Sequence, residues 1–207
     1  MSPMLLQPLS SEMYSQLAQY LQLLSRWNKK INLTAVRNSG ILVGLHLAEC
    51  LRAAQRIPVG VETVLDFGSG AGFPGIPIQI ARPELRVTLA ESQNKKAAFL
   101  REVVRGLGLS AASIHAGRVE EMPRSSIFDL ATLRAVDKME EAMKAALHRI
   151  WPSHESRQGW CMVLTSQSEV SAIISAARIG ADAIDWELPE LIPGTEQRVI
   201  LRGSRIR

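Results

Sequence analysis

The chain has 207 residues, of which 46% are hydrophobic and 21% are charged, so it can bury a sizeable core and wholesale disorder is excluded. A formal net charge of +4 is compatible with a nucleic-acid partner but does not establish one. No apolar run approaches the ~20 residues that span a membrane. No signal peptide is evident, and the cysteines and histidines show no metal-binding spacing, so we expect a cytoplasmic protein with neither membrane partner nor metal.

The first helix predicted along the chain ends in a polar, basic segment. Apolar side chains recur at helical spacing from Leu17 to Trp27, behind an N-cap at Ser10 or Ser11. The basic end is usually a solvated face, but the same residue types bind phosphate groups of nucleic acids. The candidate phosphate contacts are Asn28, Lys29, Lys30 and Arg37.

A second helix is predicted from Ile41 to about Arg56 and carries His46. For His46, a hydrogen bond nearby or in the core is the better interpretation than catalysis, because the spacing places no partner beside it. The two helices hold too few residues for an independent domain. We therefore expect residues 1–60 to form a helical cap on an α/β body of residues 61–207, within one compact unit.

The body begins with a hydrophobic strand, Thr63–Phe67, that runs into a glycine-rich turn and a short helix. Glycines at 68, 70 and 72 allow positive φ angles and close approach of a ligand, and a helix N-terminus behind them adds free N–H groups. Phe73 breaks the G-x-G-x-x-G dinucleotide spacing, and no P-loop lysine follows. Class I methyltransferases, which bind S-adenosylmethionine (SAM), use such an acid-x-G-x-G-x-G turn. A structural glycine turn in another α/β protein is the alternative.

The residues expected to line that site are those of the turn. They are Asp66, Gly68, Gly70, Gly72 and Phe73.

The second predicted strand, Arg86–Ala90, ends in Glu91 and Ser92. An acid about 20 residues beyond the turn is where a carboxylate grips a ribose diol in this architecture. Glu91 fits that role, and a surface or capping glutamate is the alternative. Ser92, which we place with Glu91 in the cofactor site, can cap the next helix, predicted from about Asn94 to Leu107.

The third predicted strand, Ala112–Ala116, leads to the edge where an adenine would lie. Backbone groups there, or Glu120, could read the exocyclic amine of the base. The fourth strand, Phe128–Leu133, ends at Arg134. In class I enzymes the substrate meets the methyl donor at the end of this strand, whereas a surface ion pair is an equally good interpretation from position alone.

The rest of the chain completes an α/β pattern. The elements expected are a helix from Met139 to Ile150, a strand Trp160–Leu164, a helix over about 169–180, and antiparallel edge strands Ile184–Leu188 and Arg198–Arg202. The predicted fold is thus a Rossmann-like class I SAM-dependent methyltransferase, with a mostly parallel seven-stranded sheet, helices on both faces and an N-terminal helical cap.

Several motifs occur in collinear order over about residues 12–202. They are Trp27-Asn28-Lys29-Lys30-Ile31-Asn32-Leu33-Thr34, Asp66 to Pro77, Glu91-Ser92, Arg118-Val119-Glu120-Glu121 and Arg134-Ala135. In this order they resemble the ribosomal RNA small subunit methyltransferase G family, also called glucose-inhibited division protein B. The W-N-K-x-x-N-L-T segment joined to G-x-G-x-G-F-P-G is far more specific than a glycine turn alone.

The resemblance implies an enzyme that uses SAM to methylate N7 of a guanine in 16S ribosomal RNA or the small ribosomal subunit, and releases S-adenosylhomocysteine. It implies that Gly68, Phe73, Val119, Glu120 and Arg134 contact the cofactor. It also implies that basic residues, including Arg118 and Arg198, help to hold the RNA. We expect the protein to act as a monomer.

The chain departs from the family pattern at three places. Glu49-Cys50 stands where the family usually has Asp-Ser, and Leu133 stands where a serine usually precedes the arginine. Thr165-Ser166 replaces the usual Lys-Gly at the end of the fifth strand, which removes a positive charge near the expected substrate entrance.

The chemistry agrees with attack by N7, whose lone pair is free at neutral pH and needs no general base. An amine-methylating motif with two prolines is absent after Leu133, and Cys50 and Cys161 are expected to be structural. Arg134 is the expected catalytic residue, facing guanine O6, a phosphate or the cofactor's carboxylate.

Two other functions stay open from the sequence. One is a SAM-dependent methyltransferase with another RNA or a small molecule as substrate. The other is a ribosome-binding factor that holds SAM with weakened activity, which the missing lysine near Thr165 motivates. A dehydrogenase is the weakest alternative, because Phe73 breaks the dinucleotide spacing.

Overall fold

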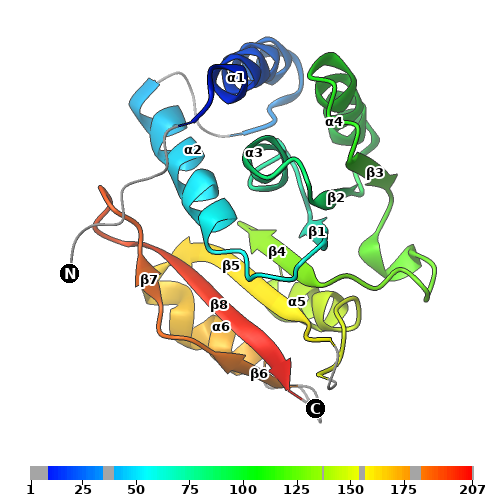
Figure 1. Cartoon of the computed structure of the whole chain (residues 1–207), viewed down its shortest axis with the longest axis vertical. Coiled ribbons are helices and arrows are strands. Elements are labelled where there is room, and N and C mark those ends of the chain that lie inside the picture. The colour runs from blue at the N-terminus through cyan, green and yellow to red at the C-terminus, as the bar shows by residue number, and fades with distance from the viewer. Residues whose placement is uncertain (1–8, 35–39, 137, 154–156, 178–182, 207) are drawn as a thin grey trace.

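The computed structural model describes residues 9–34, 40–136, 138–153, 157–177 and 183–206. Its centre is one sheet with the strand order β3-β2-β1-β4-β5-β8-β6, to which the short strand β7 adds a pairing with β8 (Figure 1). Strands β1 to β5 run parallel, and β8 is antiparallel to β5, β6 and β7. The strands are β1 (Thr63–Phe67), β2 (Arg86–Glu91), β3 (Ala112–Ala116), β4 (Leu130–Arg134), β5 (Trp160–Ser166), β6 (Ala183–Trp186), β7 (Glu190–Leu191) and β8 (Arg198–Ile206).

Six α-helices are found in the described residues, with two short 3-10 helices between them. They are α1 (Ser11–Ile31), α2 (Gly40–Gln55), α3 (Gly75–Ala81), α4 (Asn94–Gly106), α5 (Met139–Leu147) and α6 (Val170–Ala176), with η1 (Val119–Glu121) and η2 (Gln167–Glu169). The expected N-cap of the first helix is confirmed, because the hydroxyl of Ser10 accepts a hydrogen bond from the Met13 N–H at 3.2 Å.

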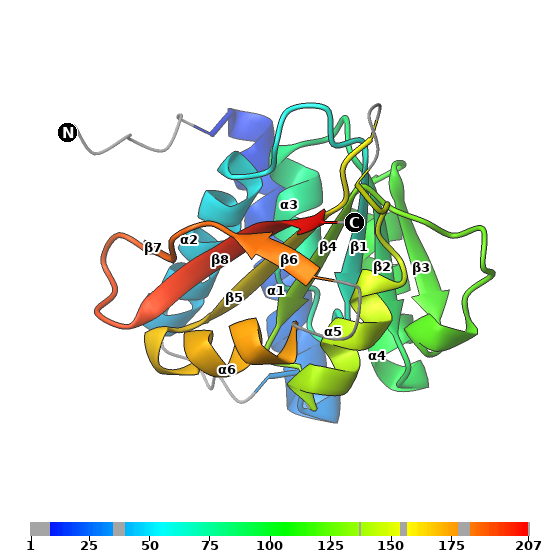
Figure 2. The same ribbon diagram turned by 90° about the horizontal axis from the view of Figure 1, so that it is seen from below.

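Successive residues of a strand point to opposite faces of the sheet. Both faces carry apolar side chains here, and helices cover both of them. In β5, Met162 and Leu164 pack into the apolar cluster that contains residues of α1 to α4, while Cys161 and Val163 pack against α5 and α6. Figure 2 shows α5 and α6 on one side of the sheet, with α2 and α3 on the other. The N-terminal helices α1 and α2 therefore share one apolar core with α3 and α4, on one face of the sheet. Helices α5 and α6 cover the other face.

The predicted elements occur in the predicted order along the chain, but the sheet has eight strands rather than seven, because the short strand β7, which was not predicted, pairs with β8. The fourth strand begins at Leu130 rather than Phe128, because Phe128 instead forms an isolated bridge with Ile150. The carboxylate of Asp129 then accepts the backbone N–H groups of Glu62 and Thr63, at 3.0 and 2.8 Å. Asp129, the residue just before β4, thus anchors the start of the neighbouring strand β1.

Three further predictions need correction. The first helix continues to Ile31, about one turn beyond Trp27, so the basic residues Lys29 and Lys30 belong to its last turn. Ser92 does not cap α4: Gln93 occupies the N-cap position, without a side-chain cap. The predicted helix over 169–180 is split into η2 and α6, and residues 178–182 lie outside the described part of the chain. Among the described helices, none combines the length and hydropathy needed to cross a membrane.

Candidate active site

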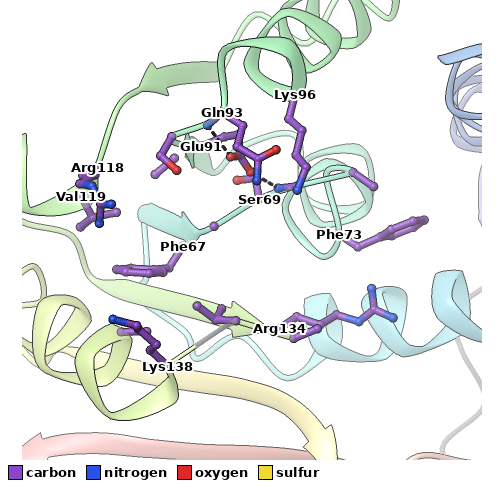
Figure 3. Close-up of a pocket in the computed structure, with 18 of the residues that line it drawn as sticks. Phe67, Ser69, Phe73, Glu91, Gln93, Lys96, Arg118, Val119, Arg134 and Lys138 are labelled. Carbon is purple, nitrogen blue, oxygen red and sulfur yellow. Dashed lines mark hydrogen bonds between the residues drawn. The ribbon is translucent and has the colours of Figure 1, made fainter. Parts of the chain in front are cut away.

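A cavity of about 660 Å³ opens at the carboxyl ends of the parallel strands. We call it the first cavity. Phe67, Glu91 and Arg134 line it from the ends of β1, β2 and β4, and Val119 lines it from the segment after β3. Figure 3 shows these side chains around one hollow, with Glu91 and Arg134 on opposite sides. This is the edge at which open α/β sheets bind ligands.

The glycine turn forms one wall of the first cavity and has the predicted backbone conformation. Gly68 and Gly70 line the cavity with φ angles of 66° and 56°, a region that favours glycine. Gly72, with φ 91°, faces the core instead: a Cβ there would lie 2.7 Å from a side-chain carbon of Ile76. Gly72 is therefore required by packing, whereas the other two let a ligand approach the chain.

Glu91 is placed to meet both the turn and a ligand. Glu91 is only 5% exposed. Its carboxylate accepts hydrogen bonds from the backbone N–H groups of Gly70, at 2.9 Å, and of Gln93, at 2.7 Å. Each carboxylate oxygen has a further lone pair for a hydroxyl group. A ribose diol fits this position, so the cavity suits the expected cofactor. Ser92 lies beside it as an exposed residue on the rim.

Asp66, which we expected in the cofactor site, is not among the residues that line the first cavity. It is fully buried, and its carboxylate accepts hydrogen bonds from the Thr132 hydroxyl at 2.9 Å and the Gly75 N–H at 3.3 Å. Burial raises its pKa to about 6, against the opposing effect of these hydrogen bonds. Asp66 thus ties β1 to β4 and α3 behind the turn, and contact with a cofactor is not supported.

The segment after β3 forms the opposite wall. Val119 is buried, whereas Arg118 and Glu120 are exposed at the rim of the first cavity. Arg149, which was not expected at the site, holds this wall: its guanidinium donates to the carbonyl oxygens of Pro123 at 2.7 Å, Met122 at 2.8 Å and Glu120 at 3.2 Å. A buried arginine satisfied by three carbonyls fixes the path of the wall without facing the ligand.

Arg134 belongs to a cluster of four charged or titratable residues, which we call the Glu49 cluster: His46, Glu49, Arg134 and Arg198. The Arg134 side chain is 12% exposed and its guanidinium lies 5.4 Å from the Phe73 ring centre. The guanidinium is hydrogen-bonded to Nδ1 of His46 and lies 3.4 Å from Oε2 of Glu49. Its Nε is buried without a hydrogen-bond partner among the described residues.

Glu49 is a buried carboxylate in contact with two arginines and a histidine. Nε of Arg198 donates to its Oε1 at 2.7 Å, and Nδ1 of His46 lies 3.6 Å from its Oε2. Burial alone would raise the pKa of Glu49, but its contacts with His46 and Arg198 and the positive charges of both arginines lower it to about 2. The spacing does provide His46 with a partner, so that part of our interpretation was wrong: Glu49 follows it by one helical turn.

A second cavity, of about 790 Å³, adjoins the first. The two share Ala135 and Val136, the residues directly after Arg134. Arg198 and Thr165 also line this second cavity, and the Thr165 hydroxyl donates to a Glu169 carboxylate oxygen at 2.5 Å. The position that usually carries a lysine in the resembling family therefore holds a buried, hydrogen-bonded hydroxyl.

The structure distributes the candidate RNA contacts over different environments. Lys29 and Lys30 are exposed at the end of α1, whereas the Asn28 side chain accepts the Thr34 N–H at 2.9 Å and so supports its own loop. Arg198 is already paired with Glu49. Arg37 lies outside the described residues. Lys96, which was not proposed as a contact, lines the first cavity.

Neither cysteine has the environment of a nucleophile. Both are fully buried, and burial raises the pKa of each thiol, to about 12 in Cys161. Within the described ranges, no group of three or more His, Cys, Asp or Glu side chains is arranged to hold a metal ion.

Comparison with known proteins agrees with this geometry. Residues 13–168 match the family model described as rRNA small subunit methyltransferase G. The chain is 41% identical, over 89% of its length and 85% of the relative, to a ribosomal RNA small subunit methyltransferase G of Xanthomonas campestris pv. campestris (strain B100).

Two solved structures share the fold at 15% sequence identity. One is M. jannaschii TYW2 in complex with AdoMet, with a TM-score of 0.63 and coverage of 84% of this chain and 79% of that one. The other is a SAM-dependent methyltransferase from Aquifex aeolicus, with a TM-score of 0.61 and coverage of 87% and 97%. The class I methyltransferase fold expected from the sequence is therefore confirmed.

Proposed function

The chain belongs to the rRNA small subunit methyltransferase G family, and from this premise we propose that it uses SAM to methylate N7 of a guanine in 16S ribosomal RNA. As a member of this family it is a SAM-dependent rRNA methyltransferase. What we propose beyond this is the methylated atom, N7, the base, guanine, and the RNA molecule, 16S ribosomal RNA. One observation carries it: the first cavity, with its glycine turn and Glu91, shares the wall Ala135–Val136 with a second cavity. A donor site and an acceptor site thus meet beside Arg134.

SAM, when bound, supplies a methyl group on a positively charged sulfur that a lone pair can attack in line. Gly68 and Gly70 provide close backbone approach, and Glu91 provides a carboxylate for the ribose. Val119 and Phe67 belong to one apolar cluster at the wall where an adenine would pack. Glu120, Ser92 and Phe73 line the same cavity and remain candidate contacts.

The proposed role of Arg134 is to orient the acceptor or the carboxylate of the donor. Its guanidinium donates hydrogen bonds only, so it cannot act on N7 itself without occupying the attacking lone pair. We propose that it donates instead to guanine O6, to a phosphate or to the cofactor carboxylate. The reaction then depends on alignment and exclusion of water rather than on a general base.

For the RNA, we propose a grip by cations at the end of α1 and at the first cavity. Lys29, Lys30 and Arg118 are exposed, and Lys96 lines the cavity. N7 lies in the narrow major groove of A-form helices, so the target guanine must be presented outside a regular duplex. We propose that the enzyme acts in the cytoplasm, as a monomer, on the small ribosomal subunit or its RNA.

A second candidate, a factor that holds SAM but transfers slowly, is favoured only by Thr165, which supplies no positive charge to the second cavity. Radiolabelled methyl transfer to bare 16S RNA and to intact small subunits distinguishes the two. We expect label in RNA with at least one of these substrates, at a rate that supports many turnovers. SAM binding without transfer to either would favour the second candidate and reject the first.

A further inference from the structure

The Glu49 cluster connects the two cavities through one side chain. Arg134 and His46 line the first cavity, Arg198 lines the second, and Glu49 contacts all three while its own side chain is 2% exposed. Glu49 itself lines neither cavity. It therefore touches neither donor nor acceptor, yet it contacts a cation that faces each of them.

The charges explain why this carboxylate matters. Two guanidinium groups that approach one another in a poorly solvated place repel, unless an anion lies between them. Glu49 is the acid that pairs with both: Oε1 takes the Nε–H of Arg198, and Oε2 lies 3.4 Å from the guanidinium of Arg134. Its low pKa means that it keeps its charge throughout the neutral and mildly acidic range.

We propose that Glu49 is a positioning residue for methyl transfer: it holds Arg134 at the first cavity and Arg198 at the second in a fixed relative arrangement. The carboxylate stabilises the extended reach of Arg198 from β8 across to α2. It also pairs with Arg134 and so holds that guanidinium above the Phe73 ring. This role rests on the proposed methyl transfer and adds to it a residue that contacts neither substrate.

The test compares Glu49→Gln, which removes the charge, with Glu49→Asp, which keeps it. Three quantities are measured: SAM affinity by calorimetry, the single-turnover transfer rate with saturating RNA, and thermal stability by circular dichroism. We expect Glu49→Gln to bind SAM within about 3-fold of wild type and to transfer at least about 30-fold more slowly. Glu49→Asp should restore most of that rate, because the charge and not only the volume is retained.

A purely structural role predicts another pattern, in which stability and SAM binding fall together and the transfer rate of the remaining folded protein is normal. That result, or equal transfer rates in Glu49→Gln and wild type, would overturn the proposal. No transfer by the wild-type enzyme would instead reject the proposed function, and with it this inference.

A double variant keeps the test decisive if Glu49→Gln alone does not fold. Removing Glu49 and Arg198 together, as Glu49→Gln with Arg198→Met, leaves the net charge of the cluster unchanged and is tolerated more readily than an unpaired charge. The matched control is Arg198→Met alone, in which Glu49 still pairs with Arg134. We expect the double variant to transfer at least about 10-fold more slowly than the control, and equal rates would overturn the proposal.

Discussion

The two halves of the strand edge hold their buried carboxylates by different means. On the glycine-turn side, Asp66 and Glu91 accept hydrogen bonds from neutral groups, namely backbone N–H groups and a hydroxyl. On the side of the second cavity, Glu49 is held by two arginines and a histidine. Their pKa values reflect this difference: burial raises that of Asp66 to about 6, whereas that of Glu49 is lowered to about 2.

The difference indicates what each half is built to do. Backbone donors are fixed by the turn itself, so the SAM half is organised before any ligand arrives and should respond little to salt. The other half depends on two long cationic side chains, from β4 and β8, that meet a carboxylate of α2, and these elements are far apart in the chain. Changes there should affect transfer more than SAM affinity, and five substitutions test this division.

The largest effect is expected for Arg134→Ala. It removes the cation between the two cavities while Glu49 keeps Arg198, so the fold should remain intact. We expect the single-turnover transfer rate to fall by about 100-fold or more, which is typical for loss of one well-placed donor. Arg134→Lys serves as a control for charge without a planar fork. Near-normal methylation by the alanine variant would remove Arg134 from the mechanism.

A second test uses the opposite pH dependence of the two carboxylates. The folded pKa of Asp66 lies above its ordinary value of 3.8, so its contribution to stability is full below about pH 4 and is lost as pH rises through about 6. Glu49, with a lowered pKa, contributes above about pH 4.5 and loses that contribution as pH falls through about 2.

Asp66→Asn mimics the protonated acid and therefore isolates the pH dependence that Asp66 contributes to stability. Relative to wild type, the variant should gain up to about 3 kcal/mol in the free energy of unfolding between pH 4 and pH 7, because two pKa units correspond to about that energy. Urea unfolding of both proteins across this range measures the difference. A difference that does not change with pH would show that Asp66 ionises normally in the folded protein.

A smaller effect is expected for Glu91→Gln, which acts on the SAM half alone. An amide offers one acceptor where the carboxylate receives both the Gly70 and the Gln93 N–H, so one donor loses its partner. We expect SAM affinity, measured by calorimetry, to fall about 10-fold, with the transfer rate at saturating SAM changed less. Thr88→Ala, on the same strand outside the cavity, is the control, and equal affinities in all three proteins would exclude Glu91 from the site.

The smallest effect is expected for Lys29→Ala and Lys30→Ala on α1. Each should reduce the slope of log affinity for RNA against log salt by about 0.7, with a few-fold change in affinity at moderate salt and none for SAM. Arg86→Ala is the matched control, since Arg86 is exposed and begins β2 at the opposite edge of the sheet. An unchanged slope in the lysine variants would place the RNA elsewhere.

The same division explains how much the sequence could predict. The glycine turn and the position of Glu91 at the end of β2 depend on local spacing, so they were predictable, although Asp66 and Gly72 proved to face inward rather than toward the ligand. The Glu49 cluster was not predicted, because Arg198 reaches Glu49 across 149 positions in the chain. The i,i+3 relation of His46 and Glu49 was the one local signal of it. No sequence pattern indicated the role of Arg149, because its partners are backbone carbonyl groups, which every residue carries.

The central claim is the site of methylation, and the most direct measurement is the content of 7-methylguanosine in ribosomal RNA of a strain that lacks the protein. Nucleosides from purified 16S RNA of the deletion and parent strains are compared by mass spectrometry, and the wild-type gene is returned as a control. The account predicts that one 7-methylguanosine per 16S molecule disappears and returns with the gene, while other methylated nucleosides are unchanged. An unaltered 7-methylguanosine content, or the loss of a different methylated nucleoside, would contradict it.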